Sequence, residues 1–184
     1  MNKIDYSSRP LNQVTRENRA VYDETWIKSM LKRLPYGVLA TCLDDQPFIH
    51  TSLFVFDEAA HALYIHSALD CRRRTNLEAN PRFCFTVTEM GRLLPGSAAM
   101  DFGVEYKGVV VFGKAVIVTD EEEARRSLQM LLDKYFPHLK PGVDYRAIAP
   151  EEIAITSVYR LEIEQWSGKQ DLAPADHPGA FEYS

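Results

Sequence analysis

Hydrophobic and polar positions alternate in short runs along most of the chain, and this pattern predicts a protein built mainly of β-strands. Apolar runs rich in β-branched residues predict strands at 36–43, 47–56, 62–67, 82–88, 105–119 and 156–166. Short polar turns join the first three of these strands into an antiparallel meander. Gly108 and Gly113 interrupt the longest run and indicate a bulge or a sharp bend, as a barrel corner needs.

Helical periodicity and helix-forming residues predict three helices, each with an aspartate that can act as its N-cap, at residues 23–34, 70–81 and 120–136. The N-cap of the second helix would be Asp70. Residues 89–104 contain three glycines and one proline without any period, so we expect a loop that serves as a lid or an insertion.

The order of these elements favours a mainly β fold with flanking helices. No alternation of strand and helix suggests a parallel sheet, and the strands are short and connected by hairpins. We therefore expect a six-stranded antiparallel β-barrel with helices packed outside it. The chain of 184 residues suits one domain. We expect an N-terminal arm at 1–22, the barrel domain at 23–169 and a C-terminal tail at 170–184.

Composition and charge narrow the choice of partners. The chain is 46% hydrophobic and 26% charged, as is typical of globular proteins. No apolar run is long enough to span a membrane, and the first residues lack the apolar core of a secretory signal, so we expect a cytoplasmic protein. The net charge of −5 argues against a nucleic-acid partner. The three cysteines have no zinc-like spacing, and we expect reduced thiols and no metal site.

Three consecutive arginines, Arg72, Arg73 and Arg74, begin the short helix after the third strand. The start of a helix attracts anions through its free N–H groups, and a guanidinium group can bind two phosphate oxygens at once. The pattern therefore fits a binding site for a phosphate monoester and equally fits a solvated basic patch. A carboxylate at Asp70 would either compete with the phosphate or hold one arginine in place.

The segment LYIHSALDCRRRTNLEANPRFCF resembles the phosphate-binding segment of the pyridoxamine 5'-phosphate oxidase-like, FMN-binding split-barrel family. YGVLATCLDDQPFIHTSLFVFDE resembles the first hairpin of that family. EYKGVVVFGKAVIVTDEEE resembles its strand that lines the flavin across the dimer interface, and is closest to the branch of nitroimidazole-resistance proteins. The resemblance covers about residues 24–170 and implies a split barrel that binds FMN in a homodimer.

The resemblance also implies roles for individual residues. The phosphate would be bound by Cys71, Arg72 and Arg73. The flavin ring would face His50, Thr51 and Ser52. The ribityl chain would follow Ile65, His66 and Ser67. The second subunit would add Tyr106, Lys107 and Gly108, with Trp166 or Lys169. By pattern alone, His50 is equally an ordinary strand residue, Lys107 an edge lysine and Trp166 part of the core.

The function implied by the resemblance is that of an FMN-dependent oxidoreductase. It would reduce a small-molecule substrate, such as a nitro compound or a quinone, with electrons from a nicotinamide cofactor. One alternative is a non-catalytic module that binds flavin, or haem through His50 or His66. Another is pyridoxamine 5'-phosphate oxidase itself, although residues that would bind pyridoxal phosphate have no clear counterpart near the C-terminus. The pattern identifies no catalytic acid or base. Two positions depart from the family: Cys71 replaces a usual Gly or Ser, and Gly108 a frequent Ser or Gln.

Overall fold

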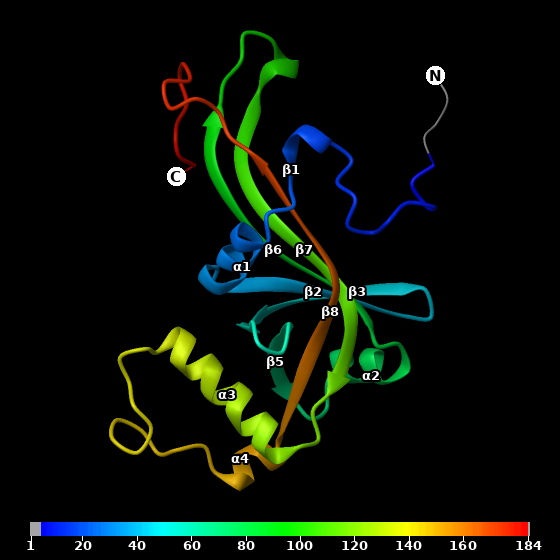
Figure 1. The fold of residues 1–184 in the computed structure, drawn as a ribbon, viewed down its shortest axis with the longest axis vertical. Coiled ribbons are helices and arrows are strands. Elements are labelled where there is room, and N and C mark those ends of the chain that lie inside the picture. The colour runs from blue at the N-terminus through cyan, green and yellow to red at the C-terminus, as the bar shows by residue number, and fades with distance from the viewer. Residues whose placement is uncertain (1–4, 184) are drawn as a thin grey trace.

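The computed structural model describes residues 5–183, which form a curled antiparallel sheet with helices outside it (Figure 1). The first four residues of the predicted arm and the last residue of the predicted tail lie outside the described residues. The strands are β1 (Ala20–Val21), β2 (Tyr36–Leu43), β3 (Gln46–Leu53), β4 (Val55–Asp57), β5 (Ala62–Ala68), β6 (Arg82–Leu94), β7 (Gly103–Ile117) and β8 (Thr156–Asp171). The helices are α1 (Glu24–Arg33), α2 (Arg72–Ala79), α3 (Glu121–Tyr135) and α4 (Pro150–Ala154), with 3-10 turns η1 (Glu17–Arg19) and η2 (Ala99–Asp101). None of these helices is long and apolar enough to cross a membrane.

The strand order shows why the sheet curls. The strands lie in the order β3-β2-β6-β7-β8-β5-β4, all neighbours are antiparallel, and β1 adds to β8. β3 and β4 stand at opposite ends of this order, yet only Phe54 separates them in the sequence. The two edges of the sheet must therefore approach each other, and the sheet closes partly on itself. This arrangement confirms the predicted mainly β split barrel with flanking helices.

The number of strands differs from the predicted six. Each predicted strand is present, but the strand predicted at 47–56 is divided into β3 and β4, and β1 is an additional short strand in the arm. Residues 46–53 pair with β2, whereas residues 55–57 pair with β5. The chain leaves one edge of the sheet and joins the other at Phe54. The apolar pattern continues across this exchange, so the sequence contains no sign of it.

The end of α3 holds this crossing point in place. Phe54 is fully buried, and its ring makes an edge-on contact with Phe85 at a centroid distance of 5.0 Å. The ammonium group of Lys134 donates hydrogen bonds to the carbonyl oxygens of Leu34, at 2.9 Å, and Phe54, at 3.0 Å. The hydroxyl of Tyr135 accepts one from the amide of Phe54 at 3.0 Å. Burial lowers the pKa of Lys134 to about 8.

The loop predicted at 89–104 is wrong for half of its length, residues 89–94 and 103–104. β6 continues to Leu94 and β7 begins at Gly103, so the two strands form a long hairpin that extends away from the barrel (Figure 1). The pairing shifts its register between Met90 and Leu93. Such an irregularity removes the two-residue period on which a strand prediction depends.

The C-terminal segment lies along this hairpin (Figure 1). β8 continues to Asp171, beyond the predicted end at residue 166. The guanidinium group of Arg92 pairs with the carboxylate of Glu105 at 2.7 Å and donates hydrogen bonds to the carbonyl oxygens of residues 173–175. The hydrogen bonds from Arg92 hold the pKa of Glu105 at about 2. The division into arm, barrel domain and tail stays a prediction.

The bulge predicted near the glycines of β7 is found beside Gly113, with the extra residue, Glu164, in the neighbouring strand β8. The pairing of β7 with β8 shifts register between Phe112 and Gly113, whereas Gly108 lies in regular register on both sides. A methyl group on Gly113 would overlap the backbone carbonyl group of Glu162. The close approach of the two strands therefore requires glycine at this position.

We expect Gly113→Ala to lower the free energy of unfolding by about 2 kcal/mol or more, because the backbones of β7 and β8 must move apart. Gly103→Ala is the matched control in the same strand, since its new methyl group would lie 3.6 Å from Leu94 Cδ1, an ordinary contact. We expect that control to change stability by less than about 0.5 kcal/mol. Urea unfolding followed by circular dichroism measures the free energy of unfolding of both variants. Equal losses of stability would contradict the conclusion that the close approach of β7 and β8 requires glycine at position 113.

Candidate functional site

A cavity of about 440 Å³ opens where the end of β5, the start of α2 and the middle of β3 meet. It is lined by Phe48, His50, His66, Ser67, Ala68, Cys71, Arg72 and Arg73. The predicted cofactor-binding residues that the structure brings together here are His50, His66, Ser67, Cys71, Arg72 and Arg73. Residues from β3, at one end of the strand order, and from β5, next to the other end, thus contribute to one cavity, because the sheet curls.

Polar contacts on two sides fix the position of α2 at this cavity. The amide nitrogen of Asn76 donates a hydrogen bond to the hydroxyl of Thr41 in β2 at 2.9 Å, and both side chains are buried. On the other side, Arg74 donates a hydrogen bond to the hydroxyl of Ser157 in β8 at 2.9 Å. Arg74 therefore holds the helix in place, while the two preceding arginines line the cavity.

The predicted N-cap of α2 is wrong. The helix begins at Arg72, its N-cap is Cys71, and no side-chain hydrogen bond caps it. Asp70 is exposed, and no hydrogen bond to its carboxylate occurs among residues 5–183. The helix begins one residue later than predicted, so Asp70 lies one position before the N-cap. The free N–H groups of the first turn are therefore not taken by a carboxylate of the chain, and they favour an anion.

Arg73 is the buried charge of the cavity wall, with 4% of its surface exposed. Its guanidinium group donates a hydrogen bond to the carbonyl oxygen of His66 at 3.1 Å and lies 5.8 Å from the centre of the Tyr159 ring. Its Nε has no hydrogen-bond partner, and no carboxylate of residues 5–183 forms an ion pair with it. Burial lowers the pKa of Arg73. Burying a charge without a counter-ion costs several kcal/mol, roughly, so this cavity favours an anionic ligand.

The surroundings of the two histidines of the cavity favour their neutral form. Partial desolvation lowers the pKa of His50 and of His66, and the positive charge of Arg73 lowers both further. A neutral imidazole can donate one hydrogen bond, accept another, or bind a metal ion. The histidines therefore add polarity to the cavity without adding charge.

The thiol of Cys71 belongs to a small polar cluster in the same wall. Its Sγ lies 3.2 Å from the hydroxyl of Ser67, which lies 2.9 Å from the hydroxyl of Tyr159. Burial raises the pKa of the Cys71 thiol, but hydrogen bonding from Ser67 and its other neighbours, with the charge of Arg73, lowers it below its ordinary value. The cluster therefore favours the thiolate form.

Three predicted site residues lie on the right strands but outside the cavity wall. Side chains alternate across a strand, so Thr51 faces away from the side of His50 and is exposed. Ser52 is 9% exposed. Ile65 alternates with His66 in the same way and is fully buried in the barrel core. Alternation thus accounts for Thr51 and Ile65, whereas Ser52 shares the face of His50 and lies beyond the cavity along β3.

The residues assigned to the second subunit do not line the cavity of their own chain. The ring of Trp166 packs against His61, at a centroid distance of 4.7 Å, and against Phe56, at 6.1 Å. Residues 106–108 of β7 pair with residues 169–171 of β8. β5 pairs with β8 only up to residue 162, so Trp166 lies beyond the end of β5 that is opposite to the cavity. Their role across a dimer interface stays a prediction.

Two residues of the site were missed by the sequence reasoning. Phe48 lines the cavity two residues before His50 in β3, and this spacing places both on one face of the strand. The period could have identified it. Tyr159 was expected only as a residue of the last strand, but its hydroxyl contacts Ser67 and its ring lies beside Arg73. No local pattern marks that role, since the contacts join β8 to β5 and α2.

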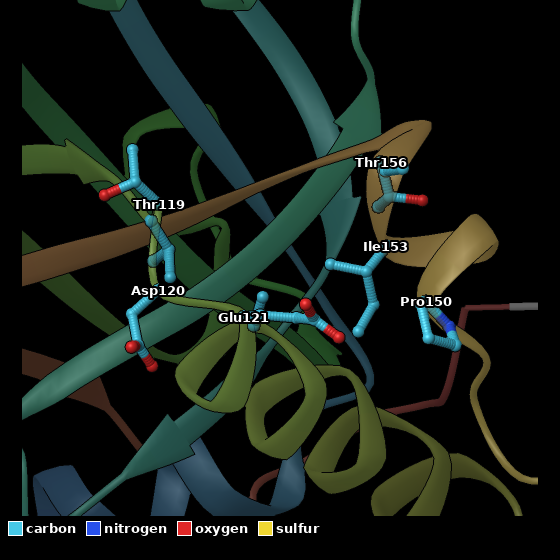
Figure 2. A pocket seen from close by; sticks show the side chains of 9 residues that line it. Thr119, Asp120, Glu121, Pro150, Ile153 and Thr156 are labelled. Atoms are coloured by element: carbon cyan, nitrogen blue, oxygen red, sulfur yellow. The ribbon is translucent and has the colours of Figure 1, made fainter.

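Another cavity, of about 270 Å³, lies between the start of α3 and α4 (Figure 2). Asp120 and Glu121 belong to its lining, which contains no Lys, Arg or His. The carboxylate of Asp120 accepts a hydrogen bond from the amide of Glu123 at 2.7 Å, so this helix start is capped. An acidic and capped site does not suit a phosphate group.

We expect Arg73→Met to raise the stability of the ligand-free protein by about 1 kcal/mol, because it removes an uncompensated buried charge. It should also abolish stabilisation by inorganic phosphate, which we expect for the wild type. Thermal melts across a phosphate series measure both effects. Arg74→Met is the control: it should lose the contact with Ser157 but keep the phosphate response. An unchanged phosphate response in Arg73→Met would contradict the assignment.

Solved structures of other proteins share this fold. The flavocytochrome Anf3 from Azotobacter vinelandii is 24% identical, with a TM-score of 0.76 over 89% of this chain and 74% of that chain. A FAD and heme binding protein from Mycobacterium smegmatis is 20% identical, with a TM-score of 0.76 over 86% of this chain and 76% of its own. A candidate 5-nitroimidazole antibiotic resistance protein from Bacteroides thetaiotaomicron is 18% identical, with a TM-score of 0.69 over 82% of this chain and 86% of its own. At these identities the likeness shows the fold alone.

Sequence comparison identifies the family. No curated protein matches the chain. The family model described as pyridoxamine 5'-phosphate oxidase matches residues 23–170, which is most of the chain and nearly the segment covered by the resemblance. The fold and this match agree, and the chain therefore belongs to the pyridoxamine 5'-phosphate oxidase-like family of split-barrel proteins.

Proposed function

We propose that the cavity binds the phosphate of FMN, with Arg72, Arg73 and the start of α2 as the phosphate site. One observation carries this proposal: Arg73 is buried in the cavity wall without a counter-ion and beside an uncapped helix start. Arg72 is exposed at the same wall and adds a second cation. Two proteins of similar structure, one a flavocytochrome and one a FAD and heme binding protein, support a flavin ligand.

The remaining walls suit the rest of the flavin. His66 and Ser67 continue from the phosphate site along β5, and they are assigned to the ribityl chain. His50 faces the cavity from β3 and is assigned to the flavin ring, with Thr51 and Ser52 in the adjoining stretch. Two cations fit the single phosphate of FMN. The diphosphate of FAD is the competing ligand, and direct titration separates the two.

A homodimer completes the site in this proposal. Tyr106, Lys107, Gly108 and Trp166 lie away from the cavity of their own chain, and the partner subunit supplies them. The hydroxyl of Tyr106 is buried and has no hydrogen-bond partner among residues 5–183. The ammonium group of Lys169 lies 5.2 Å from the centre of the Tyr106 ring. The exposed ammonium group of Lys169 can meet a flavin ring that the first subunit covers on one side only, whereas the buried Tyr106 hydroxyl would first have to turn outward.

The reaction we assign is the reduction of a small electrophile, such as a nitro compound or a quinone, with electrons from a nicotinamide cofactor, in the cytoplasm. A bound flavin supplies the electron and hydride transfer. The chain positions it: Arg72 and Arg73 hold the phosphate, and the carbonyl oxygen of His66 orients Arg73. The neutral imidazole of His50 offers a hydrogen bond at the ring without a positive charge.

A second candidate function is a binding module for haem. His50 and His66 both line the cavity, and their surroundings favour the neutral form, which is the form that binds iron. One of the similar structures is a FAD and heme binding protein, and another is a flavocytochrome. The visible spectrum of the purified protein distinguishes the candidates, since flavin gives two broad bands and haem gives a Soret band. Oxidation of pyridoxamine 5'-phosphate ranks below both, since the sequence shows no clear counterpart of the residues that bind pyridoxal phosphate.

We expect Arg73→Ala to weaken FMN binding by about 1.5–3 kcal/mol, or roughly 10- to 150-fold in Kd, because a charge-assisted phosphate contact is lost. Quenching of FMN fluorescence measures the Kd, and a parallel FAD titration shows which flavin is preferred. Arg82→Ala, at a different cleft, is the control and should bind FMN as the wild type does. Equal affinity in the wild type and Arg73→Ala would show that the phosphate lies elsewhere.

The shared site can be tested by mixing subunits. We expect Arg73→Ala and Trp166→Ala each to bind FMN poorly as pure dimers. After unfolding and refolding of an equal mixture, half of the dimers are mixed, and one site in each is free of both substitutions. Tight binding should therefore return to about one quarter of the sites. No recovery, or a monomer in light scattering that still binds FMN, would contradict the shared site.

A further inference from the structure

Cys71 differs from the other two cysteines in both place and surroundings. It lines the cavity that contains Arg73, and its Sγ lies 3.2 Å from the hydroxyl of Ser67. Cys42 and Cys84 line a separate cleft under the N-terminal arm. Burial raises the pKa of the Cys84 thiol, whereas that of the Cys71 thiol is lowered. Cys71 therefore combines access from the cationic cavity with an environment that favours the thiolate.

The charges around this thiol are predominantly positive. Arg72 and Arg73 line the same cavity, and the Nε of Arg73 is buried without a partner. The remaining charged or titratable neighbours are Arg74 from α2, His66 from β5, His50 from β3, Tyr159 from β8 and Asp70 from the preceding loop. Arg74 is paired with Glu78 at 2.8 Å. The unpaired cations thus attract anions to the sulfur itself.

We propose that Cys71 is a site of thiol–disulfide exchange that selects small anionic disulfides, such as glutathione disulfide. The Cys71 thiolate attacks one sulfur of the disulfide, and a new S–S bond forms between them. The disulfide's own S–S bond breaks, and its second half leaves as a thiolate with the bonding electron pair and takes a proton from water. The disulfide is the oxidant. The carboxylates of the attached half then lie beside Arg72 and Arg73.

This inference goes beyond the proposed function, because the exchange needs no flavin. It has a consequence for that function, since the attached anionic group occupies the phosphate site and excludes FMN. Oxidation of Cys71 would therefore switch ligand binding off, and a reducing thiol would restore it. The same cations of the cavity thus attract both the phosphate of FMN and the anionic disulfide.

The test uses ligand-free protein with equal concentrations of glutathione disulfide, the neutral hydroxyethyl disulfide and the cationic cystamine. Each rate is divided by the rate of that reagent with free cysteine, and the modified residue is found by peptide mass spectrometry. We expect modification at Cys71, with glutathione disulfide favoured over cystamine by about tenfold at low salt. High salt should reduce the preference. Arg72→Gln should reduce it as well, while Arg82→Gln, beside the other two cysteines, should not.

Two results would overturn the inference: equal corrected rates for the three reagents, or modification of Cys42 or Cys84 as fast as Cys71. The switch is tested by titrating FMN into the modified protein, and unchanged affinity would refute it. Failure of the unmodified protein to bind FMN would refute the proposed function alone. The charge preference of Cys71 is measured without flavin and still decides this inference.

Discussion

A guanidinium group held out of water without a carboxylate is costly, and the structure around Arg73 consists of features that hold it there. A backbone carbonyl oxygen and the ring of Tyr159 stabilise it only in part. Helix α2 cannot turn away, because Asn76 ties it to β2 and Arg74 ties it to β8. The cavity thus exchanges some stability of the ligand-free fold for attraction of an anion, as is common at functional sites.

The geometry of that cavity follows from how the sheet closes. The chain passes from one edge of the sheet to the other at Phe54, and the last turn of α3 fixes this residue through Lys134 and Tyr135. β3 and β5 therefore approach each other, although neither pairs with the other. Helix α2 begins where they meet. A disturbance at Phe54 would accordingly reach the cavity, even though this residue does not line it.

Local patterns predicted what local interactions determine. Six strands follow from alternation, and the caps at Asp23 and Asp120 are confirmed. Features that depend on tertiary contacts escaped prediction: the division of a strand at Phe54, the strand ends hidden by the register shift after Met90, and the start of α2 one residue beyond Asp70. The segments that carry the family resemblance supply the lining of the candidate cavity. Which side chains reach the cavity depends on the phase of alternation, which separated His50 from Thr51.

The residue at the N-cap position of α2 can change the affinity of the cavity for an anion without changing the barrel. Because the N-cap residue Cys71 has a thiol in place of the usual carboxylate, the amide groups of the first turn remain available to an anionic ligand. Cys71→Asp would let the helix cap itself, with a gain of about 1 kcal/mol in helix stability and a repulsive charge toward any phosphate. One substitution would then close the site while strengthening the fold. A variant of this fold can therefore lose its anionic ligand and at the same time gain free energy of unfolding. Higher stability is accordingly no sign that ligand binding is retained.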